Sequence, residues 1–126
     1  MSGSHEYVDG AIQLTMPWPP IELHPNSRPH WAVKSKKTKQ YRETCAWQAI
    51  EQGATQWPHD GPISFHLVFY PPNRRLRDDD GLIAAFKAGR DGIADALKVD
   101  DHRFKTTFEV APSIGGMVKV FIKEGQ

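Results

Sequence analysis

Apolar residues alternate with polar ones in four short segments of this chain, and this period-two pattern constrains the fold more than any other feature. The pattern is clearest over residues 62–70, whose apolar side consists of Ile63, Phe65, Leu67 and Phe69. It recurs in residues 11–16, in residues 103–111 and in a closing run that contains Val118, Val120 and Ile122. Each segment is therefore predicted to be a strand that buries one face. Because Gly115-Gly116 separates the last two, we predict that they pair as a hairpin.

Two longer segments lie between the strands and are predicted to be helices. Residues 35–52 contain neither proline nor glycine, although their apolar residues form no continuous stripe. In residues 81–97 the helical period of about 100° per residue places on one stripe the apolar side chains of Leu82, Phe86, Ile93 and Leu97. The opposite stripe carries Asp80, Lys87 and Asp91. The order β-α-β-α-β-β predicts an α+β fold with two layers, a mixed sheet and two helices.

Length and composition fit one domain. The chain has 126 residues, a formal net charge of +1 and one cysteine, Cys45, so an internal disulfide is excluded and a cytoplasmic location is expected. No apolar stretch approaches the ~18 residues of a membrane span, and the N-terminus lacks the apolar core of a signal peptide. Residues 1–10 are interpreted as disordered or cloning-derived, because Ser2-Gly3-Ser4-His5 resembles a vector remnant, and residues 11–126 as a single domain.

Three consecutive aspartates, Asp78-Asp79-Asp80, directly precede the second predicted helix, and Asp100-Asp101 follows it. Crowded carboxylates repel one another, by roughly 4 kcal/mol at 4 Å and an effective dielectric near 20. A chain that gathers them usually binds a hard divalent cation between them. Magnesium needs only a few protein oxygens, and two such ions can activate water and neutralise a phosphodiester during hydrolysis. Lys87 could stabilise the charge that develops at a phosphate oxygen.

Basic residues accompany the acidic ones and suit a polyphosphate partner. One group directly precedes the aspartates and consists of Arg74, Arg75 and Arg77. The other occupies residues 28–42, where six basic residues occur without an acidic one: Arg28, Lys34, Lys36, Lys37, Lys39 and Arg42. A basic surface beside an acidic pocket is what a metal-dependent nuclease requires. Both groups are therefore candidates for binding DNA.

Each candidate also has a purely structural interpretation. Aspartates before a helix cap its N-terminus and interact with its dipole. Lys87 and Asp91 could be solvated surface residues, and Asp100-Asp101 could form a turn. The basic run could be a solvated helix face. Three aromatic residues could stack on unpaired bases near a branch point or could pack in the core, namely Trp18, Trp31 and Phe104.

Three stretches occur in an order and at separations that are found together in one protein family. They are Leu14-Thr15-Met16-Pro17-Trp18-Pro19-Pro20, then Pro25-Asn26 with the basic run to Tyr41-Arg42, and finally Arg77-Asp78-Asp79-Asp80-Gly81 through Asp100-Asp101. Together they resemble the RusA family of Holliday-junction resolvases, small phage-type endodeoxyribonucleases that act in DNA recombination and repair. The resemblance spans roughly residues 12–122. It implies a homodimer, dependence on magnesium or manganese, and paired nicks across a four-way DNA junction.

The resemblance also implies roles for individual residues. Asp78 and Asp80 match the two signature carboxylates, and Asp101 matches the third. The family's lysine falls at Ala84, so Lys87 is the candidate if a short insertion separates it from Asp80. Asp100 and Asp91 become possible further metal ligands. Gly81 replaces the usual asparagine, which leaves open a second hypothesis, a DNA-junction-binding accessory protein with impaired catalysis.

Overall fold

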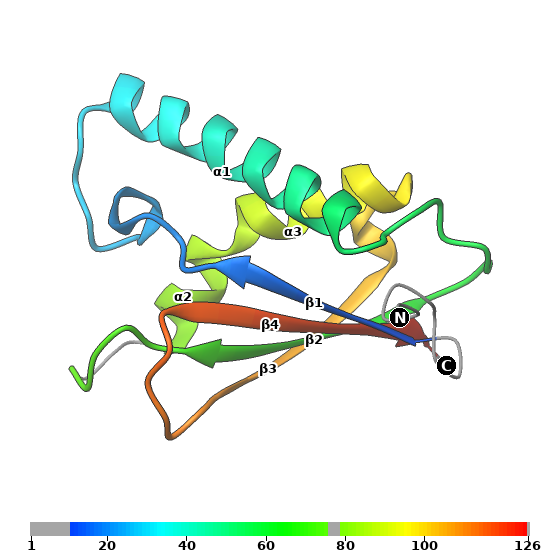
Figure 1. Ribbon diagram of the computed structural model, residues 1–126. Helices are drawn as coiled ribbons and strands as arrows, with labels where there is room; N and C mark the ends of the chain where they lie inside the picture. The colour runs from blue at the N-terminus through cyan, green and yellow to red at the C-terminus, as the bar shows by residue number, and fades with distance from the viewer. Residues whose placement is uncertain (1–10, 76–78, 126) are drawn as a thin grey trace.

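The computed structural model of the protein describes residues 11–75 and 79–125. Four strands form one mixed sheet in the order β1-β4-β2-β3, with β2 and β3 parallel and the other neighbours antiparallel. The strands are β1 (Ala11–Pro17), β2 (Ile63–Tyr70), β3 (Phe104–Val110) and β4 (Met117–Glu124). The helices α1 (Trp31–Glu51), α2 (Asp79–Ala85) and α3 (Lys87–Leu97) lie on one face of this sheet (Figure 1). The predicted two-layer α+β fold is confirmed.

The core lies between the sheet and the helices, and the predicted apolar faces of the strands form its floor. Ile12, Leu14 and Met16 of β1 are at most 3% exposed. The same face continues in β2 through Ile63, Phe65, Leu67 and Phe69, and in β4 through Val118, Val120 and Ile122, all at most 2% exposed. Registered pairs such as Leu14 with Val120 place these side chains on one side of the sheet. The alternation therefore identified the buried faces of β1, β2 and β4, whereas in β3 only Phe104 is buried and Phe108 and Val110 are exposed.

The predicted hairpin of the last two strands is wrong. β4 pairs with β1 and β2, whereas β3 pairs with β2 alone. The connection 111–116 crosses the end of β2 and is bonded to it, because Ala111 N donates to Phe69 O at 2.8 Å and Gly116 N donates to Tyr70 O at 2.7 Å. Gly116 takes a φ of 73°, which glycine adopts at little steric cost. β4 thereby reaches the centre of the sheet, where both of its edges are paired.

The helices differ from the prediction at their ends and in one break. α1 begins at Trp31 rather than at residue 35, and the His30 ring accepts the Ala32 amide hydrogen at 3.2 Å as a cap. The second predicted helix is two helices that meet at Phe86, whose backbone (φ −85°, ψ −3°) stays in the right-handed region and whose amide still donates to Leu82 O at 3.1 Å. Phe86 is 1% exposed and packs edge-on against Phe69 and Tyr41. The ring at this junction is part of the core, as the predicted apolar stripe requires.

α1 and α3 cross at very close range. A Cβ added at Gly92 would lie 2.2 Å from the backbone oxygen of Arg42 and 3.1 Å from the backbone nitrogen of Ala46. A Cβ at Gly89 would lie 2.9 Å from the rings of both Phe86 and Tyr41. Because Gly92 faces backbone atoms, which yield less readily than side chains, it is the position that most strictly fixes how α3 sits against α1. None of the described helices is long and apolar enough to cross a membrane.

The contact of α1 with the core includes a buried pair of ionisable groups. Burial raises the pKa of the Cys45 thiol to about 12. Burial, with a smaller effect of Cys45, also raises the pKa of Tyr41 far above its usual range. The Tyr41 hydroxyl donates to Pro17 O at 2.6 Å and ties α1 to the end of β1.

This pair makes stability sensitive to alkaline pH. The folded protein keeps the Cys45 proton to higher pH than the unfolded chain, so stability is full below the ordinary thiol pKa of about 8.5 and falls as pH rises toward 12. We expect the free energy of unfolding to fall by about 2 kcal/mol between pH 8.5 and pH 10. Urea unfolding across this range measures it. Cys45→Ala should show a shallower fall, and equal slopes for both proteins would contradict the assignment.

Candidate active site

The acidic run enters α2 at its N-terminus. Asp79 and Asp80 form the first turn, and both are exposed. Carboxylates in the first turn of a helix interact favourably with its dipole. Ala84 follows Asp80 by one turn on the same face. The other two members of the predicted site in this stretch, Arg77 and Asp78, lie outside the described residues.

A small cleft of about 170 Å³ lies between the helices α2 and α3 and the strands β2 and β3. Its wall consists of Leu67, Ile83, Ala84, Phe86, Lys87, Arg90 and Thr106. Ala84 and Lys87 belong to the helical side of this wall. Since Asp80 precedes Ala84 by four residues, its Cα lies about 6 Å along the helix axis from that of Ala84, toward the start of α2.

Lys87 and Asp91 form an ion pair along α3. Lys87 Nζ lies 3.4 Å from Asp91 Oδ2, an i,i+4 contact, and the two side chains are 65% and 20% exposed. Asp80 and Lys87 are exposed as the predicted polar stripe requires, whereas Asp91 is half-buried. The charge of Asp91 is thus already compensated by its neighbour on the helix.

Asp101 lies beside the cleft because Arg90 holds it there. Arg90 Nη2 donates to Asp101 Oδ2 at 3.1 Å, and Arg90 Nη1 donates to Thr106 Oγ1 at 3.1 Å. Within the described part of the chain, Arg90 Nε is buried and has no hydrogen-bond partner. Sequence analysis did not single out Arg90 or Thr106. The sequence does contain one signal for Arg90. It follows Lys87 by three residues, so the two side chains are neighbours on one face of the helix.

Asp100 has a different role from Asp101. Its Oδ1 accepts the His102 amide hydrogen at 3.1 Å and lies 2.7 Å from His102 Nδ1, so it caps the short 3₁₀ helix η3 (Asp101–Arg103). The hydrogen bond from the His102 backbone lowers the pKa of Asp100 below its usual value, and the His102 ring adds to this. The turn interpretation of Asp100-Asp101 therefore describes the local backbone, and only Asp101 contacts a residue of the cleft.

The described carboxylates have the right chemistry for magnesium but do not form a complete set of ligands. Aspartate oxygens are the hard donors that this ion prefers. Over residues 11–75 and 79–125, however, no three Asp, Glu, His or Cys side chains gather closely enough to bind one metal ion. Asp91 and Asp101 are each paired with a cation of α3. A site built on Asp80 and Asp101 thus requires a further ligand, for which Asp78 is the candidate.

The basic run lies mainly on α1. Its members are exposed except for Lys37, which is half-buried. Arg42 is engaged, because its Nε and Nη2 donate to the two carboxylate oxygens of Asp95 at 2.8 and 2.9 Å. This hydrogen bonding raises the pKa of Arg42, and the charges of Asp95, Asp91 and Asp101 add to the effect. Acidic side chains of α3 and η3 therefore surround one end of the basic surface.

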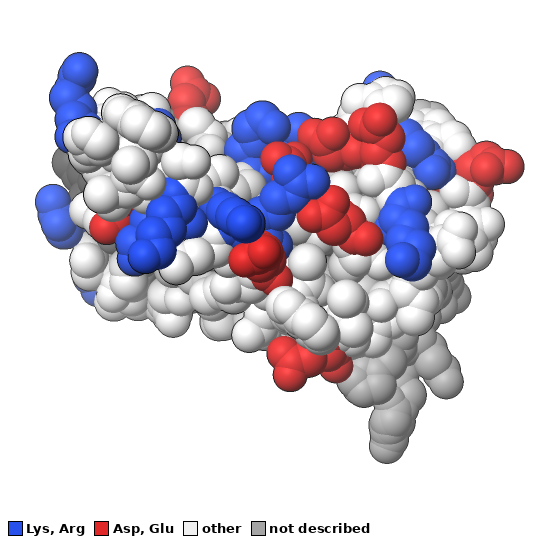
Figure 2. All heavy atoms as spheres, turned by 90° about the horizontal axis from the view of Figure 1, so that it is seen from above, with Lys and Arg blue, Asp and Glu red and all other residues white. Residues whose placement is uncertain are grey.

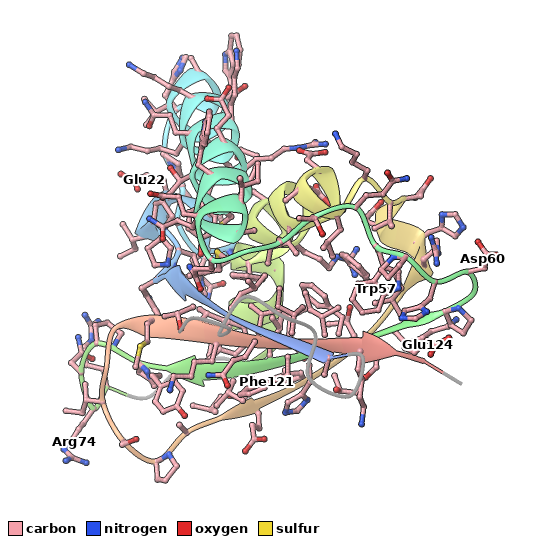
Figure 3. All side chains as sticks on the ribbon, turned by 45° about the vertical axis from the view of Figure 1, so that its right-hand side comes forward. Glu22, Trp57, Asp60, Arg74, Phe121 and Glu124 are labelled. Carbon is pink, nitrogen blue, oxygen red and sulfur yellow. The ribbon has the colours of Figure 1, made fainter. Side chains whose placement is uncertain are left out.

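Charges on the face formed by α1 and α3 are unevenly distributed. Seen from above, basic side chains dominate the end at which α1 begins, and basic and acidic side chains alternate across the middle (Figure 2). Arg74 and Arg75 follow β2 and are exposed. Arg74 lies at one end of the sheet, opposite the end that carries Asp60 and Trp57 (Figure 3). Positive charge thus occurs near the start of α2 as well as along α1.

The three aromatic candidates have different environments. Phe104 is 6% exposed and stacks on Phe65 with ring centroids 4.3 Å apart, so it belongs to the core. Trp18 is half-buried and meets the edge of Phe69. Trp31 is 76% exposed at the start of α1. Of the three, Trp31 offers the most ring surface to a ligand.

Comparison with known proteins adds one relative. No protein-family profile matches the chain. A protein of Xylella fastidiosa (strain Temecula1) is 49% identical over 94 residues, which cover 72% of this chain and 61% of the relative. That relative is described only as an uncharacterized protein. The chain thus spans less than two thirds of the length of the relative, and the activity must be argued from the site.

Proposed function

We propose that the protein is a magnesium-dependent endodeoxyribonuclease that cuts branched DNA at four-way junctions, with manganese as an alternative ion. The proposal includes a homodimer, because a four-way junction has two-fold symmetry and an isologous dimer presents two equivalent sites to it. It also includes a cytoplasmic location, in a bacterium or a phage-infected cell, where such DNA occurs. Resemblance to the RusA family in three ordered stretches suggested this activity.

The observation that carries the proposal is the cleft beside α2 and α3. Asp80 lies one turn before its wall, Asp101 is bonded to a residue of the wall, and the two are 21 positions apart in the sequence. Neither carboxylate is part of the cleft wall itself, but two carboxylates beside one cleft suit a divalent ion if a third donor joins them. When bound, magnesium supplies an activated water and neutralises charge on the phosphoryl group.

Lys87 fits the role of the family's lysine despite its displacement. The resemblance assigns that lysine to Ala84, and Ala84 and Lys87 line the same cleft about one turn apart. An ammonium group at Lys87 can therefore reach the space that a side chain at position 84 would face. Its role would be to donate hydrogen bonds to a phosphate oxygen as negative charge develops there. The contact with Asp91 holds Lys87 along the helix until substrate binds.

Arg90 acts in this proposal through Asp101. By donating to one carboxylate oxygen, the guanidinium fixes the direction of the Asp101 side chain. The bond to Thr106 anchors the guanidinium to β3 in turn. Arg90 is thus a positioning residue, and it also lowers the repulsion between Asp101 and any other carboxylate at the cleft.

A second candidate function is a junction-binding accessory protein that no longer cuts. The pairing of Asp91 with Lys87 and of Asp101 with Arg90 favours it, since ion-paired carboxylates attract a metal less strongly. The absence of an asparagine amide at Gly81 also favours the accessory role. Such a protein would retain the basic surface and bind junctions without cleavage.

A cleavage assay separates the two candidates. Labelled four-way junctions and linear duplexes of the same sequence are incubated with the protein in magnesium, in manganese and in EDTA. The nuclease proposal expects paired nicks in the junction with either metal, little cutting of the linear duplex, and no product in EDTA. Junction binding without metal-dependent nicking would establish the accessory role instead.

The basic surface of α1 leads to a separate prediction. Replacing Lys36, Lys37 and Lys39 together by alanine is expected to weaken junction binding and to reduce the slope of log K against log salt by up to about three, one for each phosphate that a lysine no longer neutralises. Fluorescence anisotropy over a salt series in EDTA measures this slope. Lys105→Ala, at an exposed lysine of β3, is the control. An unchanged slope in the triple variant would remove this segment from the DNA interface.

A further inference from the structure

The first ten residues of α1 form a helix that contributes nothing to the core. The buried residues of α1 are Tyr41, Cys45 and Ala49, all in its second half. From Trp31 to Gln40 none is buried, and this end of the helix rises away from the strands (Figure 1). Most of the stability of a helix in a protein comes from burying an apolar face, which this stretch of about 15 Å does not do.

Charge makes this half of α1 still less stable on its own. Its first turn carries no acidic residue, and lysines crowd the positive end of the helix dipole. Lys34 and Lys37, and likewise Lys36 and Lys39, are like charges three positions apart, which repel on a helix surface. An anionic partner would remove both unfavourable effects. The arrangement therefore has the charge complementarity of a binding surface.

A groove of about 550 Å³ runs along this half of α1, between it and α3. Its lining is Trp31, Lys34, Ser35, Thr38, Lys39, Arg42, Ala88 and Asp91. The six residues from α1 recur at intervals of three and four, so they form one face of the helix, with an exposed aromatic ring at one end and cations and hydroxyls after it. This face combines donors for a chain of phosphates with a platform for a planar ring.

We propose that this groove, which we call the α1–α3 groove, binds a single unpaired strand of DNA, with one base stacked on Trp31 and the following phosphates held by Lys34 and Lys39. An aromatic platform in a basic groove is the common arrangement for single strands. A duplex keeps its bases stacked inside and offers Trp31 no free base face. Asp91 lines the groove and pairs with Lys87, which lines the cleft between α2 and α3, so the groove and the cleft adjoin.

This inference rests on the proposed function only for the choice of DNA as the partner. Lys87 lines the cleft between α2 and α3, and its partner Asp91 lines the α1–α3 groove, so a strand in the groove would lead from an unpaired region toward that cleft. At a branch point, bases beside the crossover are the ones that can leave the stack. The groove would thus select substrates that contain unpaired nucleotides near the cut.

The chain offers a matched control for the test. Trp31 and Trp47 are both exposed tryptophans of α1, at 76% and 66%, and only Trp31 lines the groove. Binding of a labelled oligothymidylate and of a blunt duplex is measured by fluorescence anisotropy in EDTA, for the wild type, Trp31→Ala and Trp47→Ala. The absence of metal keeps the readout independent of cleavage.

We expect the wild type to bind the oligothymidylate more tightly than the duplex. Trp31→Ala should weaken oligothymidylate binding by roughly 5- to 150-fold, the equivalent of one base–aromatic stack, and leave duplex binding nearly unchanged. Trp47→Ala should match the wild type in both. Oligothymidylate should also quench tryptophan emission in the wild type and in Trp47→Ala but not in Trp31→Ala.

Two results would overturn the proposal: equal effects of the two tryptophan variants, or duplex binding as tight as single-strand binding in the wild type. Displacement of the oligothymidylate by anionic phospholipid vesicles at equal phosphate concentration would likewise overturn it in favour of a membrane surface. Failure of the nuclease proposal alone would give a different result from failure of the groove proposal. The protein would then bind the single strand through Trp31 and cut no DNA in either metal.

Discussion

Asp80→Asn is expected to lower magnesium-dependent cleavage of a four-way junction by about a thousandfold or more. The exchange keeps the size of the side chain and removes the charge that a divalent ion requires. A metal that stabilises the transition state contributes several kcal/mol, and each 1.4 kcal/mol corresponds to about a factor of ten in rate. Single-turnover cleavage of a labelled junction measures the loss.

The fold should survive this exchange. Asp80 is exposed in the first turn of α2, so its replacement forfeits a dipole interaction of at most about 1 kcal/mol. Relief of repulsion from the adjacent aspartates offsets part of that loss. Thermal unfolding without metal should therefore be nearly unchanged, and added magnesium should raise the Tm of the wild type more than that of the variant.

Asp60→Asn is the matched control for this prediction. Asp60 is an exposed aspartate at the end of the sheet opposite Arg74 (Figure 3), and the Asp60→Asn protein should cleave like the wild type. Wild-type activity in Asp80→Asn would remove this carboxylate from the chemistry. A large loss of stability without metal would indicate instead that Asp80 serves mainly to start the helix.

Gly92→Ala should destabilise the protein by about 2 kcal/mol or more, or roughly 5–10 °C in Tm. Two effects of opposite sign compete at this position. Alanine favours a helix interior over glycine by about 0.5–1 kcal/mol. Its Cβ, however, would lie 2.2 Å from the Arg42 backbone oxygen, and a backbone atom yields less readily than the end of a side chain. The steric effect should win because α1 and α3 would have to separate.

Two further variants make the stability test specific. Thr44→Ala changes an exposed residue of the same α1 and should alter stability by no more than about 0.5 kcal/mol. Gly89→Ala meets the rings of Phe86 and Tyr41 at 2.9 Å, and these side chains can adjust more easily than backbone. The expected order of stability is thus Thr44→Ala, Gly89→Ala, Gly92→Ala. A Gly92→Ala protein as stable as the wild type would show that the helices do not cross so closely.

Local patterns predicted the elements well and their partners poorly. The alternation in β1, β2 and β4 identified the residues of their core-facing sides. Successive side chains of a strand point to opposite faces, so a strand with one covered face alternates apolar and polar residues. The pairing of β4 was missed because Gly115-Gly116 is compatible with a hairpin and equally with a loop that passes over β2. Which of the two occurs is decided by hydrogen bonds to Phe69 and Tyr70, far away in the sequence.

For the helices and the site, too, local patterns predicted single elements better than the contacts between them. α1 lacked an apolar stripe because half of it has no core to face, which is why its start at Trp31 was missed. Asp101 was singled out from its sequence, but its partner Arg90 was not. The two meet because Lys98 ends α3 in a left-handed conformation (φ 58°) and turns the chain back toward the helix. Such a meeting depends on the path of the chain, and residue spacing alone does not reveal it.

The central place of β4 has a consequence for how this protein is made. β1 and β2 are joined only through β4, so the sheet stays split into two parts while residues 117–124 are still inside the ribosome. Until then the backbone N–H and C=O groups along the facing edges of β1 and β2 stay unpaired, and any factor that shields a nascent chain would act in that interval.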